Sequence, residues 1–258
     1  MKKLILILSF TQFLLFSWLA VAAPKLPAID KVWEEISNDD GILIHRKEVP
    51  DSSLVAFRGE AMVDASLAKV SNILIDTSRK KEWVARIEEA KNVREISLFE
   101  RIEYNHTASG FFAVRDRDFV FNAKGEFDKA NRRATFRLKS VEDPLMPETD
   151  KVRGWLNESA YILTEVEPGK KTHVVVEIHA DPRGSVPKWL VNLFQKSWPR
   201  RTLEGIRTQA AKPDVTEHAG VKAVFQEEPA LAQPAVLSAP LKKISATGQK
   251  KAVKKAKR

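Results

Sequence analysis

The chain has 258 residues, a formal net charge of +9 and no cysteine. The lack of cysteine excludes disulfides, thiolate metal sites and a cysteine nucleophile. Residues 1–22 carry a charge of +2 and residues 213–258 carry +5, so only +2 remains for the part between them. The central part is therefore close to neutral, and we expect no specific nucleic-acid binding.

The N-terminal segment has the order of a secretory signal peptide. Lys2 and Lys3 precede a long apolar run, which the small residues Ala20, Val21 and Ala22 follow. We expect residues 1–22 to be cleaved after Ala22 and the protein to be exported, to the periplasm or outside the cell. The alternative is an uncleaved anchor, although the apolar run is slightly short for a full membrane span.

The C-terminal segment, residues 213–258, is rich in proline and alanine and ends in KKISATGQKKAVKKAKR, which has eight basic residues and no acidic one. Such a composition buries too little apolar surface to offset the entropy of ordering, so we predict disorder. Two roles stay open: binding of anionic lipid or another polyanion, or a solubilising extension.

Residues between these segments are numerous enough for one domain. A short helix is predicted over residues 30–37. A hairpin follows, with strands over 42–49 and 54–63 around the turn VPDSS. A helix capped by Asp64 or Ser66 comes next, because apolar residues recur there at helical spacing.

The following hundred residues alternate with period two. The predicted strands cover residues 87–98, 101–108, 117–127, 132–141, 152–166 and 172–180. Short turns such as EPGKK indicate an antiparallel sheet. The sequence shows neither a glycine-rich phosphate loop nor the strand-helix alternation of a nucleotide-binding fold.

The last predicted helix carries an apolar stripe within KWLVNLFQKSWPRR. Its members are Trp189, Leu190, Leu193, Phe194 and Trp198. Pro199 lies within this stripe, where it either bends the helix around the domain or provides a hinge. The order of elements predicts an α+β fold, in which a curved antiparallel sheet grips the long C-terminal helix.

Alternation also predicts which strand residues face that helix. In strand 117–127 the predicted inward residues are Arg117, Phe119, Phe121 and Ala123. In the preceding strand, Tyr104 and His106 are expected to face inward. The inward set mixes aromatic and small side chains, which either leaves room for a ligand or is filled by the helix.

Three stretches, DTSRKKEWV, FFAVRDRDFV and DPRGSVPKWLVN, occur in an order that resembles the StAR-related lipid transfer (START) domain. The likeness covers roughly residues 29–211, within a predicted domain over 23–212. It implies a helix-grip fold whose sheet and last helix enclose a tunnel for one lipid-like molecule. The helix or nearby loops would act as a lid.

The resemblance implies that the protein binds a lipid or other hydrophobic molecule and transfers or senses it, without covalent chemistry, cofactor or metal. We expect a monomer that touches the membrane surface transiently. The loop EDPLMPETD after Val141 is a candidate for that contact, or an irregular connection. The candidate ligand-binding residues are Tyr104, His106, Arg117, Phe119, Phe121, Ala123, Trp189, Leu190, Leu193 and Phe194.

One departure from the family affects the expected ligand. Sterol-carrying members place an acidic residue and an arginine opposite each other in the tunnel, and counting along this chain gives Tyr104 and Ala123 at those positions. Neither is charged. The resemblance therefore does not predict a sterol held by a buried ion pair, and Tyr104 with His106 would supply milder hydrogen bonds.

Specific residues of the sequence bear on other chemistries. A polyketide cyclase or aromatase of the same fold is the enzyme alternative, for which the carboxylates of Glu88, Glu89, Glu103 and Glu177 are available. Metal binding is not expected, since His45, His106, His173 and His179 lack tight ligand spacing. Arg117 and Asp118 either contact the ligand or fix the strand to a neighbouring loop, and we favour the second.

Overall fold

The computed structural model describes residue 26 and residues 30–110 and 114–226; the predicted signal peptide lies outside them. The first strands and helices in chain order are β1 (Glu34–Asp39), β2 (Ile42–Lys47), β3 (Ala56–Val63), α1 (Leu67–Ile75) and η1 (Thr77–Glu82). The central strands are β4 (Ile87–Ser97), β5 (Glu100–Thr107), β6 (Arg117–Asp128) and β7 (Arg133–Ser140). The last elements are β8 (Val152–Arg153), β9 (Trp155–Glu167), β10 (Lys171–Asp181), α2 (Lys188–Ala210) and α3 (Ala219–Gln226).

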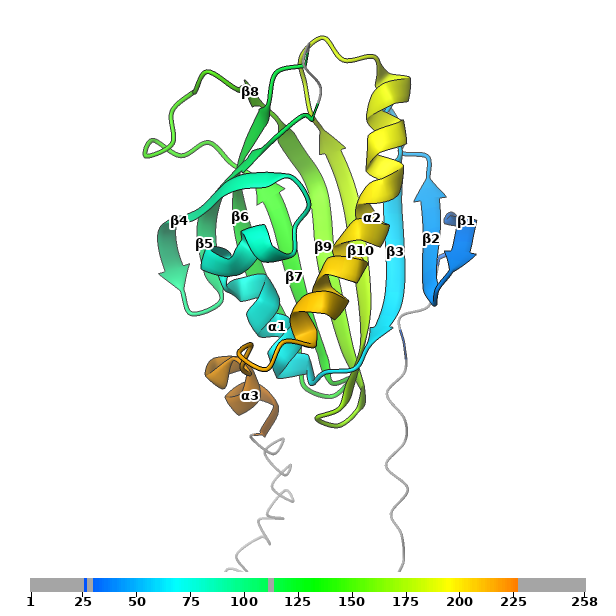
Figure 1. Cartoon of the computed structure of the whole chain (residues 1–258), viewed down its shortest axis with the longest axis vertical. Helices are drawn as coiled ribbons and strands as arrows, with labels where there is room; N and C mark the ends of the chain where they lie inside the picture. The colour runs from blue at the N-terminus through cyan, green and yellow to red at the C-terminus, as the bar shows by residue number, and fades with distance from the viewer. Residues whose placement is uncertain (1–25, 27–29, 111–113, 227–258) are drawn as a thin grey trace, which may run out of the picture. The chain divides into compact units, whose positions relative to one another are not determined.

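The strands form one curved sheet in the order β1-β2-β3-β10-β9-β7-β6-β5-β4, with antiparallel pairing throughout this path, and β8 pairs in parallel with β6 (Figure 1). Antiparallel neighbours need only short turns, which explains why this long meander could be recognised from the period-two pattern. The predicted α+β helix-grip architecture is confirmed.

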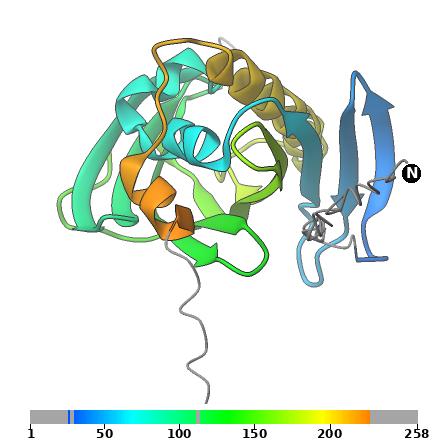
Figure 2. The same ribbon diagram turned by 90° about the horizontal axis from the view of Figure 1, so that it is seen from below.

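Helices α1 and α2 lie on the concave side of the sheet (Figure 2). Leu203 and Ile206 of α2 are fully buried in the main core, together with Val70 of α1. Gly59 of β3 lets the helix approach closely, because a Cβ at that position would lie 2.7 Å from Pro199 Cβ. The sheet and the second half of α2 therefore pack tightly.

Helix α2 continues through Pro199 and changes direction near its middle (Figure 1). Proline has no N–H to bond to the carbonyl four residues earlier, so the helix can bend there. Pro199 is buried against Gly59. The bend therefore follows the curve of the sheet. This agrees with the first of the two alternatives for Pro199, in which the helix bends around the domain.

The N-terminal helix predicted over residues 30–37 is wrong. The chain forms strand β1 at the edge of the sheet and pairs with β2 through a turn at Asp40 and Gly41, both with positive φ. A bulge between Glu35 and Ser37 shifts the register. The bulge breaks the period-two pattern, so the apolar spacing of this short segment resembled that of a helix.

Disorder from residue 213 onward is wrong for residues 213–226. This segment carries α3, and Val215 and Val221 are buried. The backbone N–H of His218 donates to the carbonyl of Ala68, which attaches the segment to α1. The prediction of disorder rested on the average composition of the whole C-terminal segment, in which the few apolar residues that anchor its first part carry little weight. Residues 227–258 lie outside the described part of the chain.

Candidate functional site: a cavity under helix α2

A cavity of about 300 Å³ lies between the concave face of the sheet, η1 and the first half of α2. Its walls are mostly apolar and aromatic. They include Trp83, Phe119, Phe121, Phe136, Leu138, Leu156, Tyr161 and Trp198. A hollow of this size is at the lower end of the ~300–1,000 Å³ range of small-molecule sites, so the sheet and helix leave room for a guest.

The register of β5 and β6 decides which residues face this cavity. Glu103 is opposite Phe121, and Asn105 is opposite Phe119. Residues directly opposite each other in an antiparallel pair share a face of the sheet. Arg117, Phe119, Phe121 and Ala123, which alternation placed inward, all line the cavity, and so do Arg101, Glu103, Asn105 and Thr107 of β5.

Tyr104 and His106 are on the opposite face of the sheet, so their predicted inward orientation is wrong. Tyr104 is buried in a small outer cluster with Ile102 and Val120, and the His106 Nε2 lies 2.8 Å from a carboxylate oxygen of Asp116. Part of the loop after β7 packs on the outer cluster. Because both faces of β5 are covered, alternation alone could not tell the inner one from the outer one.

A charged cluster lies inside the cavity where Tyr104 was expected to contribute a neutral group. Glu103 is fully buried, accepts a hydrogen bond from Lys80 of η1, and forms an ion pair with Arg101, whose Nη2 lies 2.5 Å from Glu103 Oε1. Burial favours protonation of Glu103, but Lys80 and Arg101 outweigh it and hold its pKa below the ordinary value. The carboxylate is therefore ionised, and the interior contains a buried ion cluster that sequence counting missed by one residue.

The cluster is in contact with the floor of the cavity. Lys80 Nζ lies 5.5 Å from the centre of the Phe121 ring. Burial and the nearby Glu103 charge raise the pKa of Tyr161, so its phenol stays neutral. The Tyr161 ring packs edge-on against Trp83, with the ring centres 6.5 Å apart. The stretch DTSRKKEWV supplies both Lys80 and Trp83, which was the available sequence signal for these two cavity residues.

Several buried polar atoms of the cavity wall have no hydrogen-bond partner in the described part of the chain. They are Trp83 Nε1, Arg101 Nε, Glu103 Oε1, Asn105 Oδ1, Ser159 Oγ and Gln195 Oε1. Buried polar groups are nearly always paired in folded proteins. Their concentration around one hollow indicates that a guest or water molecules complete the hydrogen bonding there.

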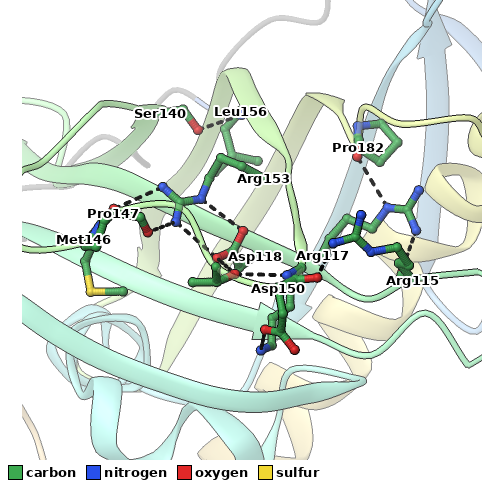
Figure 3. Close-up of polar contacts among 12 residues, drawn as sticks. Arg115, Arg117, Asp118, Ser140, Met146, Pro147, Asp150, Arg153, Leu156 and Pro182 are labelled. Carbon is green, nitrogen blue, oxygen red and sulfur yellow. Dashed lines mark hydrogen bonds and ion pairs between the residues drawn. The ribbon is translucent and has the colours of Figure 1, made fainter.

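Arg117 and Asp118 belong to two different environments (Figure 3). Asp118 points to the outer face, is fully buried and is held by both arms of the Arg153 guanidinium. Arg117 faces the cavity side and donates to the carbonyls of Arg115, Pro182 and Arg183. Burial lowers the pKa of Arg117. Arg117 thus fixes the loop before α2 to β6, the anchoring role favoured for this pair, although its side chain also borders the cavity.

Of the apolar stripe predicted on α2, Trp198 lines the cavity, whereas Trp189, Leu190 and Leu193 do not. Trp189 is 69% exposed and Leu193 is 56% exposed. Leu190 is half-buried outside the cavity wall, and the Phe194 side chain lies outside the described residues. The inward face carries Val191, Gln195, Ser197, Trp198, Arg201 and Thr202. Because several of these residues are polar or charged, an apolar pattern alone could not identify this face.

No group of three or more His, Asp or Glu side chains among the described residues could hold a metal ion. Within residue 26 and residues 30–110 and 114–226, no helix has the length and apolar character required to span a membrane. His45 and His173 both lie beside Glu60 on the outer side of the sheet, away from the cavity.

Comparison with known proteins gives consistent results. Relatives include an uncharacterized protein of Pseudomonas aeruginosa, 24% identical over 72% of this chain and 90% of its own length. Another is the phosphatidylcholine transfer protein of Mus musculus, 22% identical over 67% of this chain and 80% of its length. Both spans correspond to most of the relative's chain.

Solved structures share the fold. Human StAR-related lipid transfer protein 5 has a TM-score of 0.64 at 19% identity and covers 70% of this chain and 86% of its own. A STAR-related lipid transfer protein fragment from Xanthomonas axonopodis has a TM-score of 0.63 at 24% identity and covers 70% and 99%. The sequence model of the START domain matches residues 23–208. The chain described here therefore belongs to the START domain family.

Proposed function

We propose that this protein binds one lipid-like molecule in the cavity under α2 and carries it between membranes, without covalent chemistry. The observation that supports this most strongly is the hollow itself, with aromatic walls and unpaired polar atoms. A chain of about sixteen methylenes loses roughly 13 kcal/mol on entering water, at ~0.8 kcal/mol per methylene. A dry cavity returns most of that free energy, and the barrier to leaving a membrane falls.

The membrane-facing end in this proposal is the one where α2 begins. Trp189 and Leu193 are exposed there, and Leu145 in the loop between β7 and β8 is 64% exposed. Figure 1 shows this loop and the start of α2 at the same end of the folded part. Exposed tryptophan and leucine side chains suit the membrane interface.

The carboxylates favour binding over catalysis. Of the four carboxylates that were weighed for an enzyme, only Glu103 lines the cavity. Its two oxygens are held by Lys80 and Arg101, and its lowered pKa makes it a poor proton acceptor. A signal peptide over residues 1–22 would place this carrier outside the cytoplasm, which is part of the proposal.

A vesicle assay with a fluorescent acyl lipid tests the proposal. The full chain is expected to accelerate transfer from donor to acceptor vesicles, and Ala123→Phe, which fills the cavity floor, is expected to abolish that acceleration. Lys124→Phe, on the next residue of the same strand but exposed, serves as the control and should transfer normally. Equal transfer by Ala123→Phe and the wild type, with both folded, would overturn the proposal.

A further inference from the structure

The charges that line the cavity are strongly unequal. Among the described residues its wall includes five cationic side chains and one carboxylate, Glu103. The cations are Lys80, Arg86, Arg101, Arg117 and Arg201. We infer that the ligand is an anionic amphiphile with a single chain, whose carboxylate or phosphate lies against Arg101 and Lys80. This inference rests on the proposed function and specifies its ligand class.

The local charge count at the buried cluster supports a negative ligand group. Lys80 and Arg101 have side chains only 8% and 9% exposed, and both pair with the same Glu103. One carboxylate neutralises one of the two cations, so a buried positive charge remains. Buried charge is unfavourable unless it is paired. A bound monoanion would pair this excess positive charge, whereas a neutral or cationic head group would leave it unpaired.

Two buried hydrogen-bond donors of the cavity wall also lack an acceptor in the described part of the chain. Arg101 donates through Nη2 to the carbonyl of Leu74 and forms an ion pair with Glu103, while its Nε is buried without a partner in the described part of the chain. Trp83 Nε1, also buried, has no partner within the described part of the chain. Both atoms are donors without any acceptor role. An anionic oxygen, which only accepts, is the group that satisfies them.

Three further cations border the cavity, and two of them are exposed. Arg86 and Arg201 border the cavity but are exposed, and Arg117 borders it behind the loop that precedes α2. Exposed cations at an opening raise the local concentration of anions and speed their association. The exposed cations of the cavity wall therefore favour an anionic ligand, as the buried cluster does.

The size of the cavity limits the apolar part. Its volume of about 300 Å³ lies at the lower end of the ~300–1,000 Å³ range of small-molecule sites. A phospholipid has two long acyl chains, where a single-chain amphiphile has one. One acyl chain, or a compact ring skeleton, with one acidic group fits this volume better.

The inference is tested with four ligands that share one chain: palmitate, hexadecyl phosphate, hexadecanol and hexadecylamine. Binding to the full chain, freed of bound lipid, is followed through the fluorescence of Trp83 and Trp198, which line the cavity. Palmitate or hexadecyl phosphate should bind about tenfold more tightly than hexadecanol, and hexadecylamine should bind most weakly. The better of the two acids identifies carboxylate or phosphate as the natural group.

Two substitutions separate charge recognition from a structural role. Arg101→Gln should remove the preference for the acid over the alcohol. Glu103→Gln should increase the affinity for the acid, because the positive excess grows, whereas a purely structural Glu103 would lower the affinity for all four ligands alike. Lys124→Gln, an exposed charge on β6 outside the cavity, is the matched control and should bind like the wild type.

The outcomes are distinct from those for the proposed function. Equal affinity for palmitate and hexadecanol in the wild type, or an unchanged preference in Arg101→Gln, overturns the anionic ligand but leaves lipid carriage intact. If the wild type binds none of the four and transfers no lipid between vesicles, the proposed function fails as well.

Discussion

Glu103 shows how one residue position can determine both the chemistry of the cavity and the pH dependence of the fold. Its carboxylate is fully buried between Lys80 and Arg101. Removing the charge of one partner in such a cluster leaves the others uncompensated, which usually costs more than the cluster contributes. The contribution of the Glu103 carboxylate to stability is therefore best measured by protonating it, that is, by following unfolding as a function of pH.

The first prediction concerns acid unfolding. The pKa of Glu103 is lower in the folded protein than its ordinary value, so its contribution to stability is present above the unfolded pKa of about 4.3. That contribution is lost as the pH falls through the folded pKa. In urea unfolding between about pH 3 and 6, the wild type should lose stability more steeply below about pH 4.3 than Glu103→Gln.

Asp118 also has a lowered pKa, but it is present in both proteins, so the difference between their pH profiles isolates Glu103. Parallel profiles would show that the Glu103 carboxylate is not held in its ionised form by its neighbours.

Among the individual cavity residues, the sequence predicted those of β6 but not those of β5. The inward face of β6 could be read because Phe119, Phe121 and Ala123 form a clear apolar set. In β5 the apolar and aromatic residues Ile102 and Tyr104 face the other way. The rule that apolar residues face inward failed there, because the cavity holds charges and the outer face is covered.

The two halves of helix α2 have different surroundings. Its second half is core, with Leu203 and Ile206 fully buried, while its first half covers the cavity with Val191, Gln195 and Trp198. The bend at Pro199 lies between them. The sequence predicted a long helix and, as one of two alternatives, a bend at Pro199. It did not predict the rotation of the helix, because the exposed Trp189 and Leu193 carried the stronger apolar signal.

The second prediction concerns the contact between α2 and the end of η1. A Cβ on Gly205 would lie 2.1 Å from the backbone oxygen of Trp83, and a backbone atom cannot move aside easily. Gly→Ala inside a helix normally stabilises by up to ~1 kcal/mol. Gly205→Ala should instead lower the free energy of unfolding by about 1–3 kcal/mol, measured by chemical denaturation.

Gly220→Ala in α3 provides the matched control, because its nearest neighbour is the end of the exposed Leu98 side chain. It should change stability little. A Gly205→Ala protein as stable as the wild type would mean that α2 and Trp83 are not in the close contact described.

The third prediction concerns α3, which extends the ordered chain beyond the family match. A chain that ends at residue 212 should lose the two buried valines Val215 and Val221, at ~1.5–3 kcal/mol each as an upper estimate. We expect a loss of about 3 kcal/mol in the free energy of unfolding. A chain that ends at residue 226 keeps them and should match the full chain; equal stability of both truncations would show that α3 is not part of the fold.

The folded part as a whole has two distinct regions: a cavity under α2 and an exposed apolar surface near the start of α2. The sequence predicted the architecture because the turns, alternation and motif order all agree. It could not predict the division between interior and surface on α2, since that depends on how the helix is rotated against a sheet formed from distant residues.

The fourth prediction separates these regions. Trp189→Ser with Leu193→Ser should leave binding of soluble acyl ligand unchanged, because these exposed side chains do not line the cavity, and should slow vesicle-to-vesicle transfer. Trp198→Ser, on the cavity wall, should weaken binding itself. Normal transfer by the double variant would place the membrane contact elsewhere.

Native mass spectrometry of the intact protein, purified from its own host without detergent, tests the central claim most directly. The wild type should retain one small lipid-like molecule per chain, which collision releases, and Ala123→Phe should appear at the mass of the polypeptide alone. A wild-type protein that is always empty, even after incubation with host lipid extract, would contradict a ligand-carrying interior.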